Sequence, residues 1–364
     1  DPAETFRPGG LHPGRPFELT LQDGSRVGGL FFPHPEGTSP ARPLWIAGFG
    51  FLQDRWGKAA GRFYRHHLQR PEDRIDAHVL ILDHPSTAPF LAANGMLSIG
   101  AYDDARMWIE IGQYMREQQS FRGIHLLGAG VSAQTVIHAL MEDLRLELRL
   151  FESGIAISPV SDLRRYPARP LGRFATPPDV ENPWLTLRGR FWPPDHWEQR
   201  QKHLLKDLVE NQFLPHYRDI NPGHTSFGLP PNEIPIFFRK AFENRLAVLR
   251  NRQFQSKPWN EEILLADLNA FMQSTRIGPL VGRVRTPVVL LHAADDPIVP
   301  QSDFRKLGRS AENNPWVIWR LVENGGHAAF ESAYGTDYLR NLLEVLQDPD
   351  VLRNWRAEIY SENR

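Results

Sequence analysis

The chain contains no cysteine. Disulfides, thiolate nucleophiles and cysteine-ligated zinc sites are therefore excluded, and any nucleophile on a side chain must be an oxygen. The remaining residues show no spacing typical of a metal site, so we expect neither a metal ion nor another cofactor.

Long apolar runs and an excess of charge of one sign are absent too. No run approaches the roughly 18 apolar residues that a membrane-spanning helix requires, so we expect no membrane span. The 42 basic residues balance 43 acidic ones, which gives no reason to expect a general attraction to nucleic acid or to an anionic membrane surface. We therefore expect a small-molecule partner, and the oligomeric state stays open.

The N-terminus leaves the compartment open. The first ten residues contain no apolar signal-peptide core, but residue 1 is Asp rather than Met, which indicates a trimmed sequence. Both the cytoplasm and export after removal of a signal peptide remain as alternatives.

What the sequence does contain is an alternation of short apolar runs with amphipathic stretches over residues 43–159. With 364 residues, 41% of them hydrophobic, the chain can bury a large core. The two clearest helices are expected at Asp103–Gln118 and Gln134–Leu146. Continuous apolar runs of this kind predict buried strands of a mostly parallel α/β sheet flanked by helices, at Leu44–Ala47, His78–Leu82, Ile124–Leu127 and Ile155–Ile157.

This alternation stops near residue 161 and resumes near residue 281. Two more strands are expected at Pro287–His292 and Val317–Val322, and a helix at Tyr334–Leu346. Neither half could cover both faces of its own sheet, so we expect one core built from residues 1–160 and 281–364. Residues 161–280 would then form a large, mostly helical cap insertion. Two independent domains remain the alternative.

A carboxylate and a histidine follow the two strands of the second half. Asp295 and Asp296 come after the first of them, and His327 comes after the second, behind two glycines. Reactive groups gather at the carboxyl ends of parallel strands, and an acid that orients a histidine is the pattern of a hydrolase triad. Between the two aspartates we favour Asp296, because the proline after it fixes a turn. A buried structural histidine is the alternative for His327.

The segment Leu127–Gln134 predicts the turn that carries the nucleophile in such enzymes. This elbow has the pattern G-x-S-x-G, with small residues two positions before and after the nucleophile. A centre at 130 has Gly128 and Ser132 as its flanks, whereas a centre at Ser132 would place the long side chain of Gln134 at a flank. Steric fit favours Gly130, which has no side chain.

A glycine-containing loop, Gly48–Phe51, follows the first predicted strand. In this arrangement the N–H of Phe49 and the N–H of Val131 would bind the oxyanion formed during acyl transfer. The loop is a weak signal by itself, and it gains weight from the order of oxyanion loop, elbow, acid and histidine along the chain.

These blocks resemble the YheT-like branch of the α/β-hydrolase superfamily. Ser98–Ala105 is similar to its S-G-x-x-D-D motif, and Leu127–Val136 to its L-G-F-S-L-G-G-N-V motif. Leu291–Val299 and Gly325–Phe330 are similar to its A-x-D-D-P and G-G-H-x-G-F motifs. The resemblance implies an α/β-hydrolase fold with Asp296 as acid and His327 as base. Gly130 falls on the family's serine, and Ser132 falls on the small residue after it.

Three interpretations of function remain open. The first is an esterase or thioesterase that acts on an apolar acyl substrate, with Ser132 as nucleophile from a reshaped elbow. The second is an inactive, hydrolase-like binding protein that lost its nucleophile at Gly130. The third has His327 acting as a general base on water. Aromatic residues between positions 184 and 259 favour an apolar ligand, although they could instead form the core of the cap.

Overall fold

The computed structural model describes residues 14–35, 42–50, 55, 58–85, 87, 90, 93–96, 102–161, 276–296, 299–327 and 333–362. Across these ranges the strands form one eight-stranded sheet, in the order β1-β2-β4-β3-β5-β6-β7-β8. The strands are β1 (Arg15–Thr20), β2 (Arg26–Phe32), β3 (Leu44–Gly48), β4 (His78–Leu82), β5 (Ile124–Ala129), β6 (Phe151–Ile157), β7 (Val288–Ala293) and β8 (Val317–Val322).

Strands β3 to β8 run parallel to one another, and β1 and β2 form an antiparallel hairpin at one edge. Strand β6 pairs with β7 from Gly154 opposite Val288 to Ile157 opposite Leu291. Segments on either side of the long insertion therefore share one sheet. The expected cap, residues 161–280, lies almost entirely outside the described residues, so its boundaries and its helices stay predictions.

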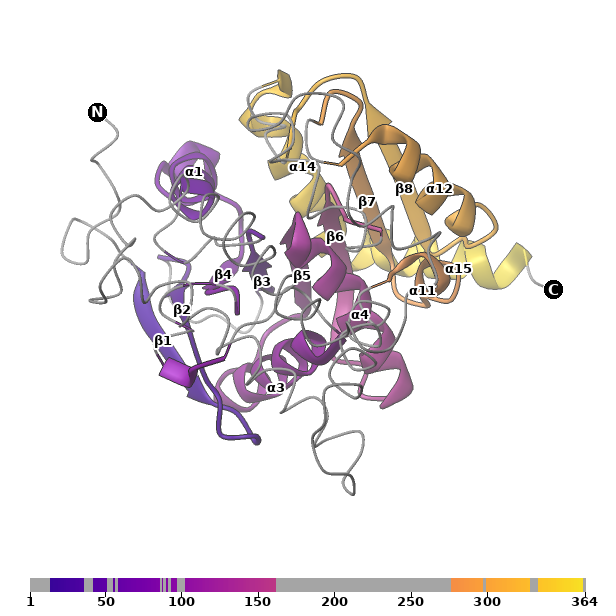
Figure 1. Ribbon diagram of the computed structural model, residues 1–364. Helices are drawn as coiled ribbons and strands as arrows, with labels where there is room; N and C mark the ends of the chain where they lie inside the picture. The colour runs from indigo at the N-terminus through magenta and orange to yellow at the C-terminus, as the bar shows by residue number, and fades with distance from the viewer. Residues whose placement is uncertain are drawn as a thin grey trace, which may run out of the picture.

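Helices cover both faces of this sheet (Figure 1). The described helices are α1 (Lys58–His67), α3 (Tyr102–Gln118), α4 (Val131–Arg145), α11 (Gly278–Val281), α12 (Gln301–Ala311), α14 (Thr336–Gln347) and α15 (Pro349–Glu362), with a short 3-10 turn, η1 (Pro71–Asp73). Helices α3, α4, α11 and α12 pack on one face, through residues such as Trp108, Val136 and Phe304. Helices α1, α14 and α15 pack on the other, through residues such as Phe63 and Leu343. Among the described helices, none is long and apolar enough to cross a bilayer.

The central strands are apolar along their whole length because helices bury both of their faces. Every residue of β3, β4, β5 and β7 is buried. Successive side chains of β3 enter opposite cores: Ile46 packs with the α3–α4 side, and Trp45 with the α1–α14 side. The mostly parallel sheet with helices on both faces is the architecture that the sequence predicted.

The structure extends two predicted elements toward the elbow. Strand β5 continues past Leu127 to Ala129, because Gly128 and Ala129 still pair with Ala156 and Ile157 of β6. Helix α4 begins at Val131 rather than at Gln134. A single residue, Gly130, therefore joins the strand to the helix.

Candidate active site

Gly130 makes the turn from β5 to α4 with φ 59° and ψ −122°. Residues with a side chain rarely adopt a positive φ of this kind, and a serine in this conformation is strained. A strand that enters a helix through one such residue is the nucleophile-elbow geometry. Gly130 N–H donates to the Ile157 carbonyl at 2.8 Å, which ties the turn to the neighbouring strand. The elbow is thus formed around a residue without a side chain.

Close backbone contacts surround this turn and require small residues. A Cβ on Gly128 would lie 2.2 Å from the Ser132 carbonyl oxygen, and a Cβ on Gly50 would lie 2.8 Å from the Ala129 carbonyl oxygen. Both contacts are with backbone atoms, which a side-chain rotation cannot relieve. Backbone contacts therefore explain why positions 128 and 50 are glycine, whichever residue occupies position 130.

Asp296 and His327 meet at the carboxyl edge of the sheet. His327 Nδ1 lies 3.0 Å from Asp296 Oδ2 and 3.2 Å from Oδ1. A carboxylate accepts hydrogen bonds, so Nδ1 carries the proton, and Nε2 of the neutral ring presents its lone pair. The Asp296 side chain is fully buried and the His327 side chain is 26% exposed, so the pair is anchored on one side and accessible on the other.

The two loops that carry the acid and the histidine are also tied through Asp295. Its Oδ1 accepts a hydrogen bond from Gly326 N–H at 2.8 Å, one residue before His327. Val299 N–H donates to Asp296 Oδ1 at 2.9 Å and holds the second carboxylate. The structure brings Asp296, not Asp295, to the imidazole, while Asp295 supports the loop of the histidine.

His327 Nε2 is directed at Gly130. A Cβ built on Gly130 would lie 3.1 Å from this nitrogen and 3.8 Å from Gly50 Cα. The lone pair of the base therefore faces the position where an elbow side chain would project. Gly130 and Gly50, neither of which has a side chain, both lie close to this position.

Ser132 lies two residues further, in the first turn of α4, and is buried. Its Oγ accepts a hydrogen bond from Gly50 N–H at 3.0 Å. A Cβ on Gly48 would lie 2.9 Å from that oxygen, so the serine packs against the Gly48–Gly50 loop. Within the described residues, the structure does not bring the Ser132 hydroxyl into hydrogen-bond contact with His327.

The remaining residues expected at the site surround the elbow. Val131 is the first residue of α4, where a helix leaves its N–H without an intrahelical acceptor. Phe49 is half-buried on the Gly48–Gly50 loop, and its ring packs 5.3 Å from the ring of Phe63 in α1. Gly50 N–H is used by Ser132, which leaves Val131 and Phe49 as the N–H groups to consider for an oxyanion.

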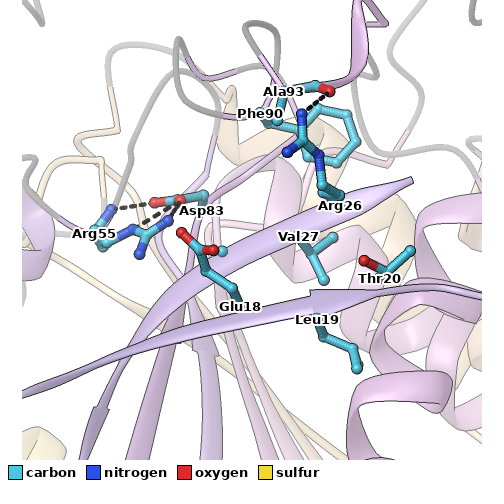
Figure 2. A pocket seen from close by; sticks show the side chains of 10 residues that line it. Glu18, Leu19, Thr20, Arg26, Val27, Arg55, Asp83, Phe90 and Ala93 are labelled. Carbon is cyan, nitrogen blue, oxygen red and sulfur yellow. Dashed lines mark hydrogen bonds and ion pairs between the residues drawn. The ribbon is translucent and has the colours of Figure 1, made fainter. Parts of the chain in front are cut away.

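A separate pocket of about 210 Å³ lies at the hairpin edge of the sheet. Figure 2 shows an ion pair between Arg55 and Asp83 on one side of it, and Arg26 turned toward Ala93 on the other. Arg55 Nε and Asp83 Oδ2 are 2.8 Å apart, and Arg55 Nη1 also donates to the Gly29 carbonyl. The pair therefore ties β2 to the end of β4. The lining residues are Glu18, Leu19, Thr20, Arg26, Val27, Gly28, Arg55, Asp83, Phe90 and Ala93, none of which belongs to the Asp296–His327 pair.

The described part of the chain contains no group of three His, Asp or Glu side chains that could hold a metal ion. Among the described residues, the elbow offers an imidazole oriented by Asp296 and the backbone N–H of Val131, the first residue of α4.

Comparisons with known proteins agree with this architecture. No family model and no curated protein sequence matches the chain. Among solved structures, an esterase of Pyrococcus furiosus is 12% identical with a TM-score of 0.52, over 94% of this chain and 93% of the esterase. A 2,6-dihydroxy-pseudo-oxynicotine hydrolase is 12% identical with a TM-score of 0.53, over 92% and 68% of the two chains. A bacterial membrane phospholipase A is 15% identical with a TM-score of 0.50, over 94% and 87%. At these identities the likeness concerns the fold, and it shows that the chain has the α/β-hydrolase fold.

Proposed function

We propose that the protein is a hydrolase of carboxylic esters or thioesters with an apolar acyl group, in which His327 activates a water molecule. The observation that carries this proposal is the direction of His327 Nε2, which faces the side-chain position of Gly130 at 3.1 Å. Asp296 accepts a hydrogen bond from the other ring nitrogen, Nδ1. A base oriented in this way can take a proton from any hydroxyl that lies over Gly130.

The proposed reaction needs no group beyond those at the elbow and a water molecule. His327 Nε2 takes a proton from water as the water oxygen attacks the substrate's carbonyl carbon. The N–H of Val131, with that of Phe49, stabilises the negative charge that forms on the carbonyl oxygen. The bond to the leaving group then breaks, and the proton on Nε2 passes to the departing alkoxide or thiolate. Asp296 stabilises the imidazolium between these steps.

Two alternatives remain for the same site. Ser132 is a side-chain hydroxyl close to the elbow, and it would serve as nucleophile if the Gly48–Gly50 loop moved away from it. The lack of a side chain at Gly130 also supports a protein that binds an acyl compound without cleaving it. Both alternatives use the same elbow, so an experiment must separate the nucleophile from the base.

The similar structures agree with the reaction class. They include an esterase, a hydrolase and a phospholipase, so ester or related bond cleavage is a known use of this fold. The apolar substrate rests on the aromatic residues expected in the cap, outside the described residues.

The test is hydrolysis of p-nitrophenyl esters of two to eight carbons by the wild type and by Ser132→Ala, with His327→Ala as the control. We expect turnover in the wild type and in Ser132→Ala, its loss in His327→Ala, and no acyl-enzyme mass after acid quench. Loss of turnover in Ser132→Ala, with an acyl group trapped on the wild type, would assign the nucleophile to Ser132. Binding of the esters without turnover would instead favour the binding protein.

A further inference from the structure

A second histidine lies on the other side of Asp296. His292, in β7, is fully buried, and its Nδ1 is 3.7 Å from Asp296 Oδ2. Its ring stacks on Phe304 of α12, with centroids 4.8 Å apart. Asp296 therefore stands between two imidazoles, His327 on the accessible side and His292 on the buried side.

The protonation of His292 is fixed by the partner of its other nitrogen. Nε2 lies 2.9 Å from the Val299 carbonyl oxygen. A carbonyl can only accept, so Nε2 must carry the proton. Burial is the first cause that lowers the pKa of His292, which keeps the ring neutral, and Nδ1 is then a lone pair. Among the described residues, this Nδ1 has no hydrogen-bond partner.

These contacts close a ring around the acid. His292 Nε2–H donates a hydrogen bond to the carbonyl of Val299, and Val299 N–H donates one to Asp296 Oδ1. The other carboxylate oxygen, Oδ2, faces His292 Nδ1. A lone pair cannot donate to a carboxylate, so His292 does not compete for Asp296. Of the two imidazoles, only His327 offers the carboxylate an N–H.

We propose that His292 is a positioning residue, which holds Val299 through its carbonyl oxygen and thereby keeps the Asp296 carboxylate aimed at His327 Nδ1. Its role for hydrolysis rests on the function proposed above, but its effect on the acid does not. Other titratable groups near the ring are Asp295 and His327. Asp295 is engaged with Gly326 N–H, so Asp296 is the carboxylate that the buried ring influences most directly.

The test reads the tautomers of both histidines by long-range 1H–15N NMR of the full chain, with resonances assigned by substitution. In the wild type at neutral pH we expect His292 with its proton on Nε2 and His327 with its proton on Nδ1. His292→Phe keeps the ring and its stacking on Phe304 but loses the N–H. In that variant His327 should shift toward the Nε2–H form that histidine prefers in water, and ester turnover should fall about tenfold.

A matched variant separates positioning from general damage. His292→Gln carries an N–H that can reach the Val299 carbonyl, so it should restore the Nδ1–H tautomer of His327 and most of the turnover. A proton on Nδ1 of His292 in the wild type would overturn the proposal. An unchanged His327 tautomer in a folded His292→Phe would also overturn it. If the wild type cleaves no ester but the tautomers respond as described, the positioning role stands and the proposed hydrolysis fails.

Discussion

The two halves of the candidate site differ in the functional groups that they contain. In the segments after β7 and β8 the acid, the histidine and their supporting hydrogen bonds are all present, with the Asp296 side chain fully buried and the His327 side chain partly accessible. On β5 and α4 the backbone turn is present with its positive φ, but Gly130 supplies no functional group. The half with Asp296 and His327 can transfer a proton, whereas the elbow half contributes only backbone next to the histidine.

On the function proposed above, the elbow serves a purpose apart from carrying a nucleophile. The turn brings the N-terminus of α4, with Val131 as its first residue, to the carboxyl end of β5. Close contacts at Gly128 and Gly50 maintain it. Under the same proposal, such a site suits chemistry on a bound molecule that brings its own hydroxyl or water.

The largest effect should come from removing the base. His327→Ala should lower ester turnover by about 10²- to 10⁴-fold, the usual contribution of a general acid–base group. Steady-state rates on a p-nitrophenyl ester measure it, with His66→Ala as a control on a helix outside the site. Equal rates in His327→Ala and the wild type would mean that the acid–histidine half is not used.

The elbow half should respond to a small increase in size at its flank. Gly128→Ala places a methyl group 2.2 Å from the Ser132 carbonyl oxygen, so α4 must shift. We expect a loss of about 3 kcal/mol in the free energy of unfolding, at the upper end for overpacking. Gly278→Ala is the matched control, since a Cβ there meets nothing within 4 Å. Similar urea midpoints for the two variants would argue against a tightly packed elbow.

The two halves also differ in how deeply their histidines are buried. On β5, burial lowers the pKa of His125 from 6.5 to about 3, whereas the His327 side chain is partly exposed. Between pH 6.5 and 3 the unfolded chain binds a proton at His125 that the folded chain does not, so acidification destabilises the fold. The cost at pH 4.5 is about 2 to 3 kcal/mol.

His125→Gln should therefore lose less unfolding free energy between pH 7 and pH 4.5 than the wild type. Urea unfolding at the two pH values measures the difference. Parallel pH dependences would show that His125 does not remain neutral in the folded protein.

The smallest effect should come from Ser132. Ser132→Ala removes the acceptor of the buried Gly50 N–H, which should cost about 1 to 2 kcal/mol of unfolding free energy. Turnover should change less than threefold, because the proposed nucleophile is water. Thermal melts and ester assays of the same sample separate the two. A Ser132→Ala variant that melts normally but is inactive would assign the nucleophile to Ser132 instead of water.

Much of this arrangement could be predicted from local sequence. Continuous apolar runs predicted β3, β4 and β7 because those strands are covered on both faces. The run at β8 was also predicted, although this edge strand is only partly buried. The small residues around Gly130 predicted the centre of the elbow, since the steric constraint lies within a few residues. The proline after Asp296 favoured that aspartate over Asp295, which instead reaches Gly326.

Contacts between distant segments could not be predicted. The ion pair between Arg55 and Asp83 joins residues 28 positions apart and has no local pattern. The β1–β2 hairpin does have a local signal, the Asp23-Gly24 turn between its strands, from which we predicted no hairpin. The partner of Ser132 is Gly50, on a loop more than 80 residues earlier. The sequence does not distinguish His292 from any other strand residue, because only the fold brings the Val299 carbonyl oxygen to its Nε2.

The most direct test of the central claim is to add the missing side chain. Gly130→Ser would place a hydroxyl beside His327 Nε2, since the Cβ position lies 3.1 Å from that nitrogen. The account predicts that a fluorophosphonate probe leaves the wild type unmodified, and that it forms an adduct on position 130 of Gly130→Ser which mass spectrometry can locate. An adduct on Ser132 of the wild type, lost in Ser132→Ala and unaffected by Gly130→Ser, would contradict the account.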